Sequence, residues 1–499
     1  MARFMIVSKI QYIEKMSIAV NFSQLQQYIN QTWEDKILPT LIDYIRIPNK
    51  SPLFDAHWEA NGHMDKAVKL LADWCHAHAP RGMQLEVIRE PGHTPLIFIE
   101  VPGNSERTVL LYGHCDKQPE MTGWNEGLGP WQPVLRGDKL YGRGGADDGY
   151  STFAALTAIN AIQAQGLSHP RCVILIEATE ESGSQDLLFY LEQLLPRIGT
   201  PELIVCLDSG CVNYEQLWMT TSLRGMVKAT LRVDILQEGV HSGTAGGIVP
   251  SSFQIARQLL DRIEDANTGK LLLPELFVEI PQQRVEQVRQ TADLLGQTIL
   301  DNFSFVKGAQ AITMDPYELL LNSTWRPALE IVGADGLPSI GNASNVLRPY
   351  TSLRLSFRLP PSCDSDQAGA AIKKALEANP PYHAKITCDI TDKADGWNAP
   401  LAPEALLKTF HTASEHAYGK PLMATGEGGT IPFMGMLGKK FPQAQFLVTG
   451  VLGPGSNAHG PNEFLHIPMA KKLTACVAEV IATYAVAFSQ SESPNLHDS

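Results

Sequence analysis

The stretch Tyr141-Gly-Arg-Gly-Gly-Ala-Asp-Asp-Gly-Tyr150 places two adjacent carboxylates directly after a run of glycines. Glycine allows positive φ angles and lets the backbone pass close to another group. The paired carboxylates of Asp147 and Asp148 are costly at such a place unless a cation neutralises them. Turn chemistry would account for Gly and Asp as well, so a solvated surface turn is the alternative when this stretch is considered alone.

The composition is that of a large folded protein. Its 499 residues predict two or three domains, and a hydrophobic content of 44% provides enough apolar surface for packed interiors. The net charge of −13 argues against a nucleic-acid-binding protein, which needs a basic face. The chain contains no run of about 18 apolar residues, and its N-terminal residues lack the pattern of a secretory signal. We therefore expect a soluble cytoplasmic protein with neither nucleic acid nor membrane as a partner.

The eight cysteines are scattered along the chain and include no Cys-x-x-Cys pair. This spacing indicates neither a zinc knuckle nor a thioredoxin-like site. Several of them, such as Cys172, lie in apolar runs and are expected to be buried free thiols. Such usage is typical of a reducing compartment.

The first two hundred residues predict an α/β sheet covered by helices on both faces, because apolar strands alternate with helices. The expected strands are residues 96–101, 108–112, 172–176 and 203–207, and the expected helices are residues 22–45 (bent at Pro39), 64–78, 150–165 and 186–195. In such sheets, ligand sites gather at the carboxyl ends of the strands.

After Asp208 the pattern changes to alternating, half-exposed strands. The expected strands are residues 225–233, 353–359 and 383–390, the expected helices are residues 253–264 and 368–377, and a long irregular stretch lies between. This order predicts an inserted strand–helix–strand–strand–helix–strand module of the ferredoxin-like type. From about residue 394 the first pattern returns, with helices at 403–417 and 470–488 and a strand at 445–448.

Three of the apolar strands run directly into side chains of the kind that bind metals. They lead into His114-Cys-Asp116, into Glu177-Ala-Thr-Glu180-Glu181 and into Asp208. Residues 114 and 116 of an extended chain point the same way, and a metal-binding imidazole usually donates its other N–H to a carboxylate. The alternative is a strand-end histidine that merely lies near an acid.

Each of the remaining candidate motifs has two interpretations when it is considered alone. If one carboxylate of the Glu180-Glu181 pair binds a metal, the other can act as a general base, although a solvated acidic helix start explains the pair equally well. His459 lies in a glycine-containing loop, where lone histidines are usually not ligands. Together, however, these positions supply two histidines and three carboxylates with one glutamate left over, which is ligand chemistry for two zinc ions bridged by an aspartate.

Taken in order, the motifs G-H-x-D, G-R-G-x-x-D-D, E-E-S-G-S, D-S-G, H-S-G and H-x-x-N-E span nearly the whole chain. This series resembles the di-zinc metallopeptidase family of carnosine dipeptidase, glutamate carboxypeptidase, acetylornithine deacetylase and succinyl-diaminopimelate desuccinylase. Residues 113–120 with Gly123-Trp124, and Gly428-Gly-Thr-Ile-Pro432, look closest to the dipeptidase branch.

The resemblance implies two zinc ions per chain, with manganese or cobalt as alternatives. His114 and Asp208 would bind one ion, Glu181 and His459 the other, and Asp147 would bridge both. Asp116 would orient His114. Glu180 would be the general base for a hydroxide that bridges the two ions.

The resemblance also implies substrate residues in the inserted module. His241 looks like the family histidine that stabilises the oxyanion, which the partner subunit contributes in dimeric members. Arg358 looks like the arginine that clamps the substrate carboxylate, with an exposed strand cation as the alternative. Asn345 and Thr430 are further candidates for substrate contacts.

Two departures from the family pattern put the shape of the substrate in doubt. The family usually has Asp-Asp-Lys-Gly after the glycine turn, whereas Gly149-Tyr150 follows Asp148 here. The dipeptidase branch often has an arginine before Glu-Gly-Gly, and Gly426 occupies that position here.

We therefore expect an α/β fold in which a zinc-exopeptidase-like catalytic domain (residues 20–213 and 394–488) carries an inserted ferredoxin-like lid and dimerisation domain (residues 214–393), with tails at 1–19 and 489–499. The expected activity is zinc-dependent hydrolysis of the amide bond of a short peptide, most plainly a dipeptide, by a homodimer. The alternative is a deacylase of N-acyl amino acids that uses the same site. A non-catalytic peptide or metal binder is a more distant alternative, and it would be expected to have lost Glu180 or a ligand.

Overall fold

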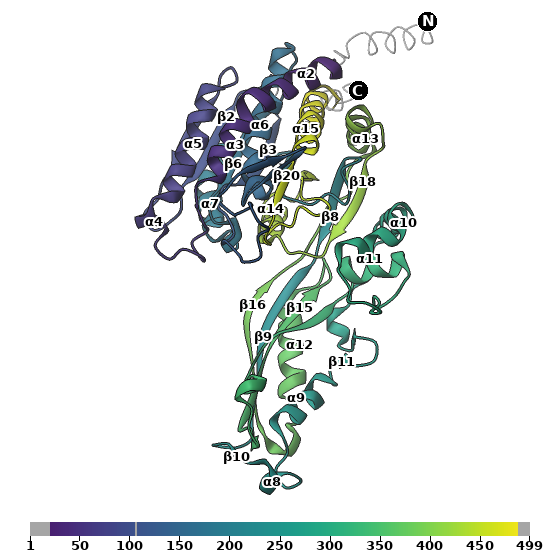
Figure 1. Cartoon of the computed structure of the whole chain (residues 1–499). Coiled ribbons are helices and arrows are strands. Elements are labelled where there is room, and N and C mark those ends of the chain that lie inside the picture. The colour runs from purple at the N-terminus through teal and green to yellow at the C-terminus, as the bar shows by residue number, and fades with distance from the viewer. Residues whose placement is uncertain (1–19, 105–106, 488–499) are drawn as a thin grey trace, which may run out of the picture. The chain divides into compact units, whose positions relative to one another are not determined.

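The computed structural model describes residues 20–104 and 107–487 (Figure 1). Contacts divide the chain into two compact units. The first unit contains the chain up to Thr220, Pro400–Met423 and the chain from Lys439 onward, and the second contains Thr221–Ala399 and Ala424–Gly438. Residues 424–438 group with the second unit, in line with the hydrogen bond from Thr221 to the carbonyl of Thr425.

The first unit is built on a six-stranded mixed sheet. Its order is β1 (Gln84–Ile88), β2 (Leu96–Val101), β6 (Arg171–Glu177), β3 (Thr108–His114), β7 (Leu203–Cys206) and β19 (Gln445–Val448). The last four strands are parallel, and β1 and β2 extend the sheet in antiparallel fashion. Every residue of β3 is buried, as expected for the centre of a sheet with two covered faces. The predicted α/β class is confirmed.

The helices of this unit, apart from the short α4 (Trp58–Asn61), which the sequence did not predict, lie close to where the apolar spacing predicts them. They are α5 (His63–Ala77), α6 (Tyr150–Ala164), α7 (Gln185–Ile198), α13 (Glu404–Tyr418) and α15 (Ile467–Ala487). Helix α6 packs against both β3 and α15 and is buried on nearly all sides. A helix that is apolar all round is expected in such a central position.

The predicted bend in the first helix is present, one turn before Pro39. The segment consists of α2 (Phe22–Thr32), a π-helical turn at Trp33–Ile37 and α3 (Leu38–Ile45). Proline lacks an N–H and its ring crowds the carbonyl four residues earlier. The wider π turn accommodates both effects.

The second unit contains a four-stranded antiparallel sheet of the predicted ferredoxin-like order. The strands are β13 (Ala328–Asp335), β15 (Tyr350–Leu359), β9 (Gly225–Asp234) and β16 (Lys385–Ala394). Strands β9 and β15 alternate strictly between buried and half-buried residues. Helices α9 (Ser252–Leu260) and α12 (Ser365–Glu377) pack on this sheet and contribute to the core on its buried face.

Two predictions for this unit are wrong. The stretch expected to be irregular contains β13 and the helices α10 (Gln282–Leu295) and α11 (Pro316–Thr324), which share a small core of Val288, Leu321 and Trp325. Their apolar periodicity is weak because that core is small. Helix α9 ends at Leu260 rather than Glu264, since the chain there enters the short strand β11 (Glu264–Asp265).

The eight cysteines are all free and buried, as predicted. None of the described helices has the length and apolar character needed to cross a membrane.

A buried ion pair fixes the glycine-rich stretch to a distant part of the chain. Strand β20 (Phe464–His466) pairs with β5 (Lys139–Tyr141), and the residues that flank this ladder are Glu463 and Arg143. Arg143 Nη1 lies 2.6 Å from Glu463 Oε2, and both side chains are buried. The other Glu463 oxygen accepts a hydrogen bond from the Gly144 N–H at 2.9 Å, and Arg143 Nη2 donates to the Gly460 carbonyl at 2.8 Å. These contacts therefore hold residues 143–144 against the 460–463 loop.

We predict that Glu463→Ala lowers the free energy of unfolding of the metal-free protein by roughly 3–5 kcal/mol, because it leaves the Arg143 guanidinium buried without a counter-ion. The double variant Arg143→Met/Glu463→Leu should recover much of this loss. Burial raises the pKa of Glu463 to about 7 despite the neighbouring Arg143. The contribution of Glu463 to stability therefore falls as the pH rises toward that value, and the double variant, which lacks this group, should gain stability relative to the wild type over this range.

Denaturant unfolding at several pH values would measure both effects. The control is Asp43→Ala, which breaks the exposed pair of Asp43 with Arg46 and should cost less than about 1 kcal/mol. Equal losses for Glu463→Ala and Asp43→Ala would contradict the prediction.

Candidate metal centre

Side chains from five segments of the first unit meet at one edge of its sheet. His114 ends β3, Glu180 and Glu181 follow β6, and Asp208 follows β7. Strand β3 lies between β6 and β7, and all three are parallel. Their carboxyl ends therefore meet, as expected for a ligand site in an α/β sheet. Asp147 and His459 reach the same place from loops.

These side chains form two groups with one member in common. His114 Nε2 lies 3.4 Å from Asp147 Oδ1 and 3.8 Å from Asp208 Oδ1. His459 Nε2 lies 3.0 Å from Asp147 Oδ2 and 3.3 Å from Glu181 Oε2. In each group the possible ligand atoms lie within 4.8 Å of one another. The two oxygens of Asp147 thus face two different histidines.

The donor atoms fit divalent cations. Among the described residues, His114 Nε2 and Glu181 Oε1 are buried with no hydrogen-bond partner. Buried polar atoms are normally satisfied, so these atoms point to a group that binds there. Imidazole and carboxylate donors suit zinc and its neighbours in the first transition row. Their role as ligands stays a prediction.

Asp116 connects the two sides of this cluster. Its Oδ1 lies 3.3 Å from His114 Nδ1, and the same oxygen accepts a hydrogen bond from the Glu180 N–H at 3.1 Å. Its Oδ2 accepts from the Glu181 N–H at 3.0 Å. His114 Nδ1 also lies 3.1 Å from the Asp116 carbonyl oxygen, so Asp116 contacts the imidazole through both its main chain and its side chain, and its carboxylate holds the loop that carries both glutamates.

The electrostatics of the cluster favour bound cations. Burial raises the pKa of Glu180 well above its usual range, and the charge of Asp208 raises it further. Burial and Asp147 do the same for Glu181. Burial alone would lower the pKa of His114, but Asp208, Asp116 and Asp147 outweigh it and raise that pKa. The metal-free cluster thus retains protons, which bound cations would displace.

The 114–118 loop is held in place by residues that the sequence did not indicate. Lys117 is fully buried and donates to the carbonyls of Tyr44 and Ile47, both at 2.8 Å. The Tyr44 hydroxyl and Asn49 Nδ2 donate in return to the Cys115 carbonyl at 2.8 and 2.5 Å. Burial lowers the pKa of Lys117 well below its ordinary value. No local pattern links residues 44–49 to this loop, because the contact is made only by folding.

Three further positions support the cluster directly. Gln118 Nε2 donates to Glu181 Oε2 at 2.5 Å, and Asp148 Oδ2 accepts from the His114 N–H at 3.2 Å. Gly144 has a φ of +79°, and a Cβ there would lie 2.5 Å from the Lys117 side chain. Glycine is thus required at this position by both the backbone and the packing.

The predicted residues of the second unit form two separate pairs. His241 lies on β10 (Val240–His241), and the next N–H, of Ser242, donates to the Asn345 carbonyl at 2.9 Å. Arg358 lies near the end of β15, where its Nη1 donates to Thr430 Oγ1 at 3.1 Å. His241 pairs with Val346, before the start of β15, so the two pairs are separated by most of a ten-residue strand, a length of about 30 Å. Within one chain, His241 and Arg358 are not brought together.

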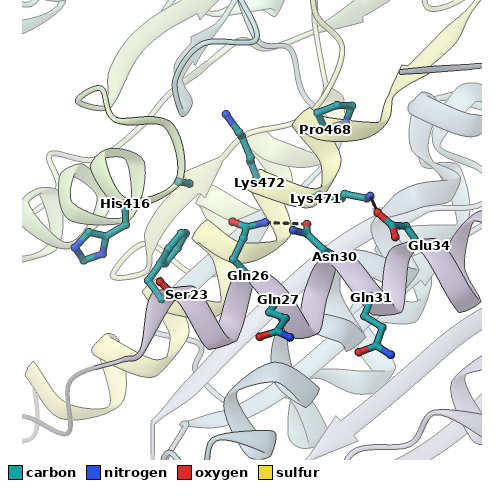
Figure 2. Close-up of a pocket in the computed structure, with 12 residues that line it drawn as sticks. Ser23, Gln26, Gln27, Asn30, Gln31, Glu34, His416, Pro468, Lys471 and Lys472 are labelled. Carbon is teal, nitrogen blue, oxygen red and sulfur yellow. Dashed lines mark hydrogen bonds and ion pairs between the residues drawn. The ribbon is translucent and has the colours of Figure 1, made fainter. Parts of the chain in front are cut away.

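A separate hollow of about 860 Å³ lies in the first unit, between α2, α13 and α15 (Figure 2). Its polar side chains mostly bind one another: Gln26 donates to Asn30 at 3.1 Å, and Lys471 pairs with Glu34 at 2.8 Å. None of the predicted site residues lines it.

Comparison with known proteins shows the family of this chain. Residues 110–483 match Peptidase family M20/M25/M40. The chain is 29% identical over 415 residues to the cysteinylglycine-S-conjugate dipeptidase of Corynebacterium striatum, covering 80% of this chain and 87% of that one. It is 26% identical over 346 residues to the Cys-Gly metallodipeptidase of Saccharomyces cerevisiae, covering 66% and 69% of the two chains.

The fold is also that of a solved relative. The crystal structure of human carnosine dipeptidase 1 superposes with a TM-score of 0.74 at 20% identity, over 93% of this chain and 99% of that one. The predicted family resemblance and the predicted hydrolase class are confirmed. Because the family match spans most of its length, the chain belongs to Peptidase family M20/M25/M40 and is a hydrolase.

Proposed function

We propose that this chain is a dipeptidase that uses two zinc ions held by His114, Asp208, Asp147, Glu181 and His459. The observation that carries the proposal is the sharing of Asp147 between two ligand groups, each with one histidine and one further carboxylate. The dipeptidase names of the relatives support a dipeptide as the substrate. Eight free thiols favour the cytoplasm as the location.

Metal ions bound at this site would polarise the amide carbonyl and acidify a water molecule. Glu180 would take the proton from the attacking water and deliver it to the amine that leaves. Burial and Asp208 raise the pKa of its carboxyl group, which makes it a stronger base than an exposed glutamate. Asp116 would keep His114 oriented and hold the backbone of Glu180 in place.

We predict that Glu180→Ala lowers kcat for a dipeptide by roughly 100- to 10,000-fold while two metal ions per chain remain bound. Asp208→Asn is the matched comparison, because it should lower both metal content and turnover. Elemental analysis and a hydrolysis assay on the zinc-loaded protein would measure both quantities. Near-normal turnover by Glu180→Ala would refute its role as the base.

The same assay tests the substrate class. Dipeptides should be cleaved with a higher kcat/KM than the corresponding N-acetyl and N-succinyl amino acids. The reverse order would identify the chain as a deacylase that uses the same residues.

The second unit is proposed to act as a lid and to form a homodimer. His241 would stabilise the oxyanion and Arg358 would bind the substrate carboxylate, with Asn345 and Thr430 nearby. Since most of strand β15 separates His241 and Arg358 within one chain, the histidine at each site would come from the partner subunit. Strand β13 is an edge strand with exposed Ile331 and Val332, which supports contact with a second copy there.

We predict that Glu180→Ala and His241→Ala, each inactive alone, restore activity when the subunits are exchanged. Random exchange should return about a quarter of the wild-type sites, because half of the dimers are mixed and each has one intact site. Unfolding and refolding the mixture, followed by an activity assay, measures this. Failure to recover activity in mixtures that contain verified mixed dimers would mean that His241 acts within its own chain.

A further inference from the structure

Two half-buried arginines of the second unit lie side by side, with no acidic partner in the described part of the chain. Strand β15 pairs with β9 so that Arg358 is opposite Met226 and Leu359 is opposite Gly225. Arg224, directly before Gly225, is therefore the diagonal neighbour of Arg358 on the same face of the sheet. Both lie on the half-buried face, away from the core covered by α9 and α12. Burial, together with the charge of Arg358, lowers the pKa of Arg224 to about 10.

The protein satisfies these two guanidinium groups only in part. Arg224 Nε donates to the Gly428 carbonyl at 3.2 Å, and its Nη1 donates to the Asn322 carbonyl at 3.3 Å. Arg358 donates from Nη1 to Thr430 Oγ1 at 3.1 Å, and that hydroxyl donates to the Arg224 carbonyl at 2.6 Å. Among the residues that the structure describes, neither arginine forms an ion pair with a carboxylate.

A third arginine of the same unit, Arg284, has a structural role and can be compared with Arg224 and Arg358. Arg284 is almost fully buried, also without a carboxylate among the described residues. Its three nitrogens donate to Asn398 Oδ1 at 2.9 Å, to Gln287 Oε1 at 2.9 Å and to the Ala399 carbonyl at 2.7 Å. All of its nitrogens are thus used by the fold. Arg224 and Arg358 are more accessible, and each keeps N–H groups free to bind a ligand.

The loop beside the two arginines is closely packed at Gly428, where an added Cβ would lie 2.9 Å from the Ser323 carbonyl oxygen. A Cβ at Gly428 would lie 3.0 Å from Arg224 Nη2, so a side chain there would crowd that guanidinium group. Two adjacent cations repel each other unless an anion lies between them. Planar guanidinium groups bind carboxylates through paired, charge-assisted hydrogen bonds.

We propose that Arg224 joins Arg358 in a two-arginine receptor for the terminal carboxylate of the peptide, and that Arg224 is thereby a specificity-determining residue. This inference rests on the proposed function for the identity of the anion. The receptor selects peptides that end in a free carboxylate at this position and discriminates against amides and longer chains.

Binding of glycylglycine and of glycylglycinamide to the zinc-loaded protein tests the proposal. Calorimetric titration of the Glu180→Ala protein, which does not turn the ligand over, compares the acid with the amide directly. Adding Arg224→Met should weaken binding of the acid by roughly 10- to 100-fold and leave binding of the amide nearly unchanged. Arg224→Lys keeps the positive charge but lacks the planar, forked guanidinium group. It should give an intermediate loss of affinity for the acid.

Arg284→Met is the matched control, since it removes a buried arginine whose three nitrogens all donate to the fold. It should lower thermal stability without changing the ratio of acid to amide affinity. An unchanged ratio in Arg224→Met, whether binding falls for both ligands or for neither, would overturn the proposal and assign Arg224 a structural role. The outcome is separate from the proposed function, which would fail instead if the wild-type protein cleaved no dipeptide.

Discussion

Repulsion among buried carboxylates is the constraint on which the first unit depends. Asp147, Asp208, Glu181 and Glu180 converge at one edge of its sheet, where burial and mutual charge hold the pKa values of both glutamates high. Such a cluster is unstable as a set of free anions. It becomes favourable when cations bind between the carboxylates. Because the two oxygens of Asp147 face different histidines, a single residue divides the cluster into two adjoining sites.

The buried cations of the protein itself are kept away from these oxygens. Lys117 donates to the carbonyls of Tyr44 and Ile47, and Arg143 pairs with Glu463. Each of them clamps a loop that carries a predicted ligand, but neither forms an ion pair with one among the described residues. These two basic residues therefore position the loops of the site and do not pair with its predicted ligands.

The second unit has the opposite electrostatic character at the end of its sheet that holds Arg224 and Arg358. There the accessible groups are N–H donors, and no carboxylate among the described residues pairs with them. A short peptide carries both an amide carbonyl and a terminal carboxylate, so it needs a Lewis-acidic site and an anion site at once. His241 and Asn345 lie about one strand length away, at the small two-stranded ladder of β10. That separation is the physical basis for the proposal that the histidine comes from a second subunit.

The sequence by itself determined the α/β class, the strands that end in His114, Glu180–Glu181 and Asp208, and the family. It could do so because buried parallel strands are continuously apolar and because a polar side chain at their ends is conspicuous. It did not reveal α10, α11 and β13, whose small shared core leaves a weak periodic signal. Only the tertiary structure decided which groups meet: Lys117 with Tyr44, Arg143 with Glu463, and Arg224 with Arg358. These contacts join residues separated by about 70, 320 and 134 positions, and no local pattern encodes such pairings, since they depend on how the strands and loops are brought together.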